Sequence, residues 1–101
     1  MSMEAKMKSS ATIPTTEAQR YMVQLCKHFG HKVPATYEGH EGHITFEMGE
    51  ASMRATPETL MIVSQATDAE GLGRLEQVME SHLKRFAFRE PELAVDWRRG
   101  A

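Results

Sequence analysis

Small and apolar residues alternate with polar residues at the start of the chain. Lysine, serine and threonine occupy one side of this segment. The positions on the other side are Ala5, Met7, Ser9, Ala11 and Ile13. A period of two is typical of a strand with one buried face, so the pattern predicts a strand over residues 4–13 that stops at Pro14.

A helical period follows this strand. Thr16 and Gln19 have the spacing of a capping box, in which the hydroxyl accepts a hydrogen bond from a free helix amide, so we expect the helix to begin there. Gly30 offers the left-handed conformation that commonly closes a helix. The apolar residues between these points fall on one narrow stripe: Ala18, Tyr21, Met22, Leu25 and Phe29.

Residues 33–66 have no helical period and alternate in four short segments. We therefore expect an antiparallel meander of four strands. In the last of them, Leu60 to Val63, both faces are apolar, so this strand should lie centrally or under a partner. Met61 and Val63 are the candidates for an exposed apolar patch. Turn-forming residues punctuate the meander: Gly39, Gly42, Gly49 and Pro57.

The strongest helical period opens at Thr67 and Glu70, which have the spacing of a second capping box. Because Pro91 disfavours a helical conformation in the residue before it, we expect this helix to end by about Phe88. Its apolar stripe is about 140° wide. The stripe consists of Leu72, Leu75, Val78, Met79, Leu83 and Phe86.

The predicted elements are in the order β-α-β-β-β-β-α-β, with a closing strand in which Leu93, Val95 and Trp97 alternate with polar or small residues. Helices with one apolar stripe and strands with one apolar face can bury these surfaces against each other in two layers. We therefore expect an α+β fold, with an antiparallel sheet and both helices on one of its faces. The 101 residues provide material for one core, so residues 1–101 should form a single domain.

Composition and charge exclude several classes of protein. No apolar run reaches the roughly 18 residues that span a bilayer, and the N-terminus has no apolar segment of the signal-peptide kind, so we expect a cytoplasmic protein without a membrane partner. The single cysteine, Cys26, excludes an internal disulfide and any Cys-x-x-Cys pair. The net charge of −2, with basic ends and an acidic middle, argues against a dedicated nucleic-acid binder.

Four of the five histidines form two pairs with His-x-x-His spacing. His28 and His31 would face together in a continuing helix, but a glycine between them indicates that they converge only in a tight turn. Cys26 points away from His28 by about 200° of arc, so these two side chains cannot share an ion while the helix holds. His40 and His43 bracket a glycine-rich turn, which is typical of a solvated hairpin tip.

His82 lies inside the apolar stripe of the second helix, so we expect it to be partly buried and hydrogen-bonded. One interpretation is a satisfied core histidine. The other is a functional base or ligand whose pKa is lowered by burial. If both helices cover one face of the sheet, His82 approaches His28 or Tyr21. On the functional interpretation, His28, His31 and His82 are candidate ligands of a metal ion such as zinc.

Cations gather near the end of the second helix. Lys84, Arg85 and Arg89 complement the negative end of the helix dipole, which is a sufficient structural role. The functional alternative is a surface for an anion or RNA, since Arg85 and Arg89 lie four residues apart on one flank and Phe88 is available for stacking. The candidate ligand-binding residues are therefore His82, Arg85, Phe88 and Arg89.

Two motifs in this chain resemble a bacterial family. The motifs are Tyr21-x3-Leu25-Cys26-x-His28-Phe29-x-His31-Lys32 and His82-Leu83-x-Arg85-Phe86-Ala87-Phe88-Arg89-Glu90, followed by Trp97. In this order they are similar to the domain-of-unknown-function family 2218, over nearly the whole chain. The resemblance implies a short α+β protein with no assigned activity. It also implies a link to iron, because related domains occur fused to siderophore-interacting flavin reductases. The signature positions map onto Cys26, His28, His31, His82, Phe86, Phe88, Arg89 and Trp97.

We consider three hypotheses for the function. The first is a non-catalytic module that binds a small molecule or a metal ion, with His28, His31 and His82 as polar groups and Arg89 as an anion anchor; the resemblance implies iron or a siderophore-related ligand. The second is a small enzyme that uses His82 as a general base. The third is an interaction protein that forms a homodimer through the open sheet face and covers the apolar patch.

Overall fold

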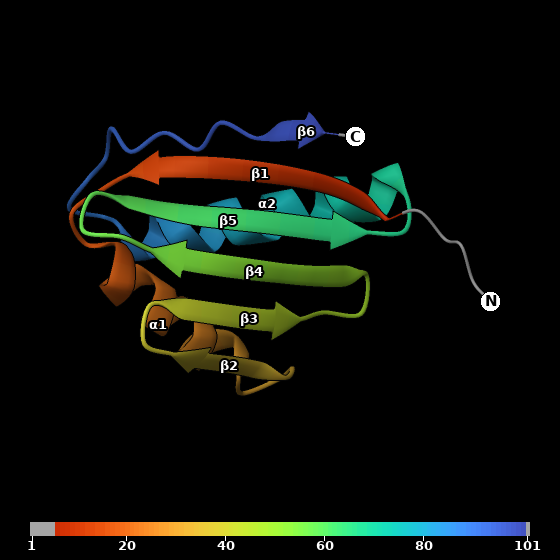
Figure 1. Ribbon diagram of the computed structural model, residues 1–101, viewed down its shortest axis with the longest axis horizontal. Helices are drawn as coiled ribbons and strands as arrows, with labels where there is room; N and C mark the ends of the chain where they lie inside the picture. Colours follow the sequence, from red (N-terminus) through yellow and green to blue (C-terminus); the bar gives the residue numbers. More distant parts are fainter. Residues whose placement is uncertain (1–5, 101) are drawn as a thin grey trace.

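The computed structural model describes residues 6–100 and consists of a sheet with two helices on one of its faces (Figure 1). Its other face is uncovered, so the two-layer α+β fold and the order of elements expected from the sequence are confirmed. The elements are β1 (Met7–Pro14), α1 (Ala18–Phe29), β2 (Ala35–Glu38), β3 (Glu41–Thr45), β4 (Gly49–Ala55), β5 (Thr59–Ala66), α2 (Ala69–Phe86) and β6 (Arg98–Gly100).

The six strands are arranged in the order β2-β3-β4-β5-β1-β6, and every neighbouring pair is antiparallel. Strands β2 to β5 form the expected meander, and β1 lies beside β5 from the pair Met7 and Ala66 to the pair Pro14 and Thr59. Strands β1 and β2 are not neighbours in the sheet, and neither are β5 and β6. The chain therefore crosses one face of the sheet twice, in the segments that contain α1 and α2. Helix α1 lies chiefly against β2, β3 and β4, and α2 lies against β1, β4 and β5, so the helices meet beneath the middle of the sheet.

The core lies between the sheet and the helices. Alternate side chains of β1, β3, β4 and β5 point inward, and the stripes of both helices are buried against them. The two layers pack closely: a Cβ atom on Gly42 of β3 would lie 3.0 Å from Sγ of Cys26 in α1. Side chains on the uncovered face are mostly polar, but Met61 is 38% exposed there. Fully buried residues of this core include Ile13, Met22, Leu25, Ile44, Leu60, Ile62, Leu75, Met79 and Leu83.

Both predicted capping boxes are wrong by one residue. Helix α1 has Glu17 as its N-cap and no side-chain cap, and the nearby hydroxyl that accepts a hydrogen bond, from Glu17 N at 3.1 Å, belongs to Thr15. Helix α2 is capped by Asp68, whose Oδ1 accepts from Gly71 N at 2.7 Å. Asp68 has the extended backbone that an N-cap requires, and its carboxylate also complements the positive end of the helix dipole.

The end of α1 also differs from the prediction. Gly30 has φ −61° and ψ −14°, which is a right-handed conformation, and its N–H still donates to the carbonyl of Cys26. The chain leaves the helix through a tight turn in which Lys32 N and Val33 N both donate to the carbonyl of Phe29. The carbonyls of Cys26 and Phe29 at the end of the helix are thus satisfied without a left-handed residue.

The closing strand is present but lies further along the chain than the predicted residues 93–98. Residues 93–97 run outside the sheet, and β6 begins only at Arg98, where it pairs with residues 8–10 of β1. Leu93, Val95 and Trp97 are nevertheless half-buried against the core. Their alternation reflects packing against the core, and Trp97 also contacts α2, where its Nε1 donates to Glu80 Oε1 at 3.1 Å. At the other end, the strand predicted to begin at residue 4 begins at Met7, and residues 4 and 5 lie outside the described part of the chain.

Within residues 6–100, neither helix has the length and apolar character needed to cross a membrane.

Candidate functional site

The two helices bring two of the predicted histidines together. His28 lies near the end of α1 and His82 in the last part of α2, and their ring centroids are 5.0 Å apart. His28 is exposed at the surface, whereas His82 is half-buried beneath it. We call these two residues the histidine pair. His31 lies in the turn after α1 and is exposed, and the described residues contain no set of three His, Cys, Asp or Glu side chains placed to hold a metal ion.

Phenylalanines surround the histidine pair. The ring of Phe29 lies 4.7 Å from that of His82 and 5.0 Å from that of Phe46, and the ring of Phe86 lies 5.5 Å from that of His28. The pKa of His28 is lowered, first by desolvation and then by the neighbouring charges of His82 and other cations. The neutral imidazole of His28 is therefore favoured over its charged form.

His82 has its hydrogen-bond partner within its own helix, as its place in the apolar stripe required. Its Nδ1 lies 2.8 Å from the carbonyl oxygen of Val78. Because a carbonyl only accepts, Nδ1 carries the proton in this bond, and in the neutral ring the lone pair is on Nε2. A histidine with only a structural role in the core would make the same hydrogen bond, so this contact does not by itself assign a function.

Phe86, whose ring lies 5.5 Å from that of His28, also lines a pocket of about 370 Å³. This pocket is formed by the start of α1 and by the chain that follows α2, and we call it the helix-end pocket. Two of the predicted ligand-binding residues, Phe88 and Arg89, line it. The complete lining is Thr16, Glu17, Arg20, Tyr21, Gln24, Phe86, Phe88, Arg89 and Glu90.

Glu90 is fixed in this pocket by two hydroxyl groups. Thr15 Oγ1 lies 2.8 Å and 3.1 Å from the two carboxylate oxygens, and the Tyr21 hydroxyl donates to the same carboxylate. Burial, together with the hydrogen bond to Glu90 and its charge, raises the pKa of Tyr21 to about 12. These contacts join the chain after α2 to the end of β1 and to α1. Sequence reasoning missed Thr15 and Glu90; the signal was an acidic residue, next to Pro91, at the end of a basic stretch.

The cations of the helix-end pocket are less restrained. The guanidinium carbon of Arg89 lies 5.7 Å from the centre of the Phe88 ring, and Phe88 is 72% exposed. Arg20 makes an exposed ion pair with Glu17 at 3.6 Å. Neither Arg85 nor Arg89 forms an ion pair with another described residue. Of the predicted ligand-binding set, Phe88 and Arg89 thus share a pocket, and Arg85 and His82 lie outside its lining.

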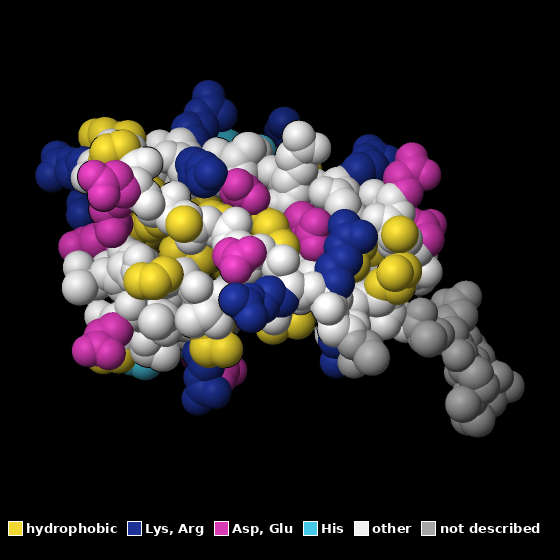
Figure 2. Space-filling model, turned by 90° about the horizontal axis from the view of Figure 1, so that it is seen from above, with side chains coloured by type: hydrophobic (Ala, Val, Ile, Leu, Met, Phe, Trp, Pro, Cys, Tyr) yellow, Lys and Arg dark blue, Asp and Glu magenta, His cyan; other side chains and the backbone are white. Residues whose placement is uncertain are grey.

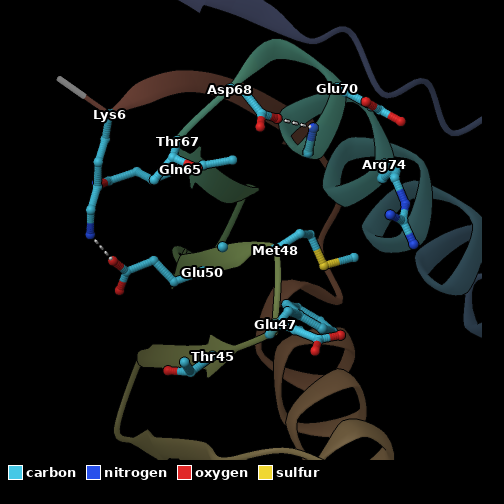
Figure 3. A pocket seen from close by; sticks show the side chains of 14 residues that line it. Lys6, Thr45, Glu47, Met48, Glu50, Gln65, Thr67, Asp68, Glu70 and Arg74 are labelled. Atoms are coloured by element: carbon cyan, nitrogen blue, oxygen red, sulfur yellow. Dashed lines mark hydrogen bonds and ion pairs between the residues drawn. The ribbon is translucent and has the colours of Figure 1, made fainter. Parts of the chain in front are cut away.

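A second pocket, of about 450 Å³, lies at the opposite end of α2 (Figure 3). Within it, Lys6 Nζ contacts Glu50 at 3.0 Å and Asp68 caps the helix, whereas no ion pair joins Arg74 to another described residue. Acidic and basic side chains are also interspersed over the side of the molecule shown in Figure 2, so no single sign of charge dominates that surface. The helix-end pocket is the stronger candidate site because it combines Arg89, which has no ion pair with a described residue, with the rings of Tyr21, Phe86 and Phe88, whereas Phe46 is the one aromatic residue that lines the second pocket.

Comparisons with known proteins agree with this fold. The family model described as "Uncharacterized protein conserved in bacteria (DUF2218)" matches residues 10–98. The NMR structure of PA4090 from Pseudomonas aeruginosa is similar with a TM-score of 0.78 and 29% identity, covering 91% of this chain and 95% of that one. No curated protein matches. The match over residues 10–98 confirms the resemblance of the two motifs: the chain belongs to the bacterial family of uncharacterised proteins DUF2218.

Proposed function

We propose that this protein is a binding module for a small organic anion with a planar apolar part, held in the helix-end pocket. The observation that carries the proposal is the combination of two arginines and three aromatic rings around about 370 Å³. A guanidinium binds a carboxylate through two parallel hydrogen bonds, and aromatic side chains bury the apolar part of a ligand.

The charges of the pocket favour a monoanion over a polyanion. Two arginines, Arg20 and Arg89, and two glutamates, Glu17 and Glu90, line it, so their formal charges balance. The carboxylate of Glu90 already accepts hydrogen bonds from Thr15 and Tyr21. A balanced pocket gives little attraction for a polyanion such as a nucleic acid, which requires an extended basic surface. One carboxylate can instead pair with Arg89, which has no other acidic partner among the described residues.

Three isosteric probes test the proposal: benzoate, the neutral benzamide and the cationic benzamidine. We expect benzoate to shift the backbone amide NMR signals of residues that line the helix-end pocket, and the neutral and cationic probes to shift them far less. Arg89→Gln should weaken benzoate binding by about tenfold or more, because a hydrogen bond to a charged group contributes about 1.5–3 kcal/mol. The matched control is Arg98→Gln, at a highly exposed arginine of β6.

Equal responses to the three probes, or equal benzoate affinities of the Arg89 and Arg98 variants, would contradict the proposal. Ferric chelates that carry carboxylates belong in the same titration, because the family resemblance links related domains to siderophore-interacting proteins. A ferric chelate that competes with benzoate would support iron-related ligands as the physiological class.

A second candidate is an enzyme in which His82 is a general base, since the hydrogen bond of Nδ1 to Val78 leaves Nε2 as the basic nitrogen. His82 does not line the helix-end pocket, so this function requires a substrate that reaches the histidine pair instead. His82→Gln should then abolish turnover while the thermal unfolding midpoint and the amide NMR spectrum remain those of a folded protein. Retention of turnover in a folded His82→Gln variant would eliminate this candidate.

A further inference from the structure

We propose that His28 and His82 bind one divalent transition-metal ion between the two helices, with copper(II) bound most tightly. This inference is independent of the organic anion in the helix-end pocket. It rests on the separation of the two rings, on ring nitrogens that have no partner, and on the surroundings of the pair.

The separation of the rings fits one shared ion. Two imidazoles that bind one ion, each through a nitrogen about 2.0 Å from the metal and at an angle of about 100°, have ring centres about 5 Å apart. The centroids of His28 and His82 are 5.0 Å apart and their planes are inclined by 47°. The two side chains come from different helices that the fold holds together, so the spacing does not depend on one flexible loop.

Suitable nitrogens are free. The Nδ1 of His82 is held by the carbonyl of Val78, which orients the ring and leaves Nε2 as the donor atom. Among residues 6–100, no hydrogen bond joins another group to Nε2 of His82 or to either ring nitrogen of His28. His28 is exposed, so its ring can turn toward the ion, and water can fill the remaining coordination positions.

The surroundings decide which ions bind. The charged groups near His28 come from both helices and from the turn after α1, namely His31, Lys32 and Arg85. These cations oppose a dication, so the site requires a metal ion with a high intrinsic affinity for imidazole nitrogen. Hard cations that need oxygen ligands are therefore excluded, and copper(II), which has the highest affinity for imidazole nitrogen among the divalent ions, is favoured over zinc(II).

The test is a copper(II) titration of the full chain, read by electron paramagnetic resonance and by the dissociation constant. We expect nitrogen hyperfine structure from two imidazoles, and at least tenfold weaker binding in His28→Gln. The matched control is His40→Gln, at an exposed histidine in the β2–β3 turn, which should bind copper as the wild type does. His28→Gln removes an exposed side chain, so it should fold even if His82→Gln does not.

An identical spectrum and affinity in His28→Gln and His40→Gln would overturn the proposal, because copper would then be bound elsewhere. The two proposed sites are also separable. His28→Gln should leave benzoate binding intact, and Arg89→Gln should leave copper binding intact, so the failure of one proposal does not remove the other.

Discussion

Removal of the Tyr21 hydroxyl is the most direct test of how the helix-end pocket is held together. Tyr21 is only 5% exposed, and its hydroxyl donates to Glu90. Tyr21→Phe keeps the ring that packs in the core and removes only this hydrogen bond. The remaining donor from a side chain is Thr15, so Glu90 would keep one hydroxyl partner.

The expected cost is about 2 kcal/mol, since a hydrogen bond to a charged group contributes about 1.5–3 kcal/mol and Thr15 retains part of the network. For a domain of this length, 1 kcal/mol shifts the thermal midpoint by roughly 4–8 °C. We therefore expect Tyr21→Phe to unfold roughly 10 °C below the wild type. The matched control is Tyr37→Phe on β2, which is 43% exposed and should change the midpoint little.

The pH dependence gives the same test a second measurement. The pKa of Tyr21 is raised from 10.0 to about 12 in the folded protein. The unfolded chain therefore loses this proton first, so the contribution of Tyr21 to stability is complete below pH 10.0 and is lost as the pH rises toward about 12. Tyr21→Phe should lack that loss. Equal unfolding midpoints of the Tyr21 and Tyr37 variants, or an unchanged alkaline loss in Tyr21→Phe, would refute the reasoning.

Three further predictions concern the scaffold. Gly49→Ala should destabilise the protein by about 2 kcal/mol or more in urea unfolding, because its Cβ would lie 2.1 Å from the backbone oxygen of Gln65. A variant with the same urea midpoint of unfolding as the wild type would contradict this packing. Gly73→Ala, inside α2, should stabilise by about 0.5–1 kcal/mol, since its Cβ would meet only the flexible end of Arg99 at 3.4 Å; a loss of stability would show that the contact is rigid. Arg99→Gln should lower the free energy of unfolding at neutral pH, because Arg99 lowers the pKa of Glu76 below 4.5. The difference in unfolding free energy between variant and wild type should shrink in acid, where Glu76 is protonated. A difference that does not change with pH would exclude this ion pair as its cause.

The local elements of this protein could be predicted from its sequence because their causes are local. The stripe from Leu72 to Leu83 determines the buried face of α2, and the alternation around Ile44 and Ile62 determines the inward face of the sheet. These patterns depend only on the period of each element. Because each helix and strand has one apolar face, a two-layer arrangement could be predicted from these patterns.

Element ends and the candidate site required the tertiary structure. Alternation over residues 93–98 predicted a strand, but one-sided burial against the core produces the same pattern as pairing in a sheet. Tyr21 and Glu90 are 69 positions apart in the chain. The periodicity of a single helix or strand does not indicate which residues of distant elements become neighbours in the fold. The sequence by itself determined which faces are buried, because burial follows the repeat of each element. Only the packing of α1 beside α2 decided that His28 lies against His82 and that Arg89 shares a pocket with Tyr21, because those neighbours depend on the path of the whole chain.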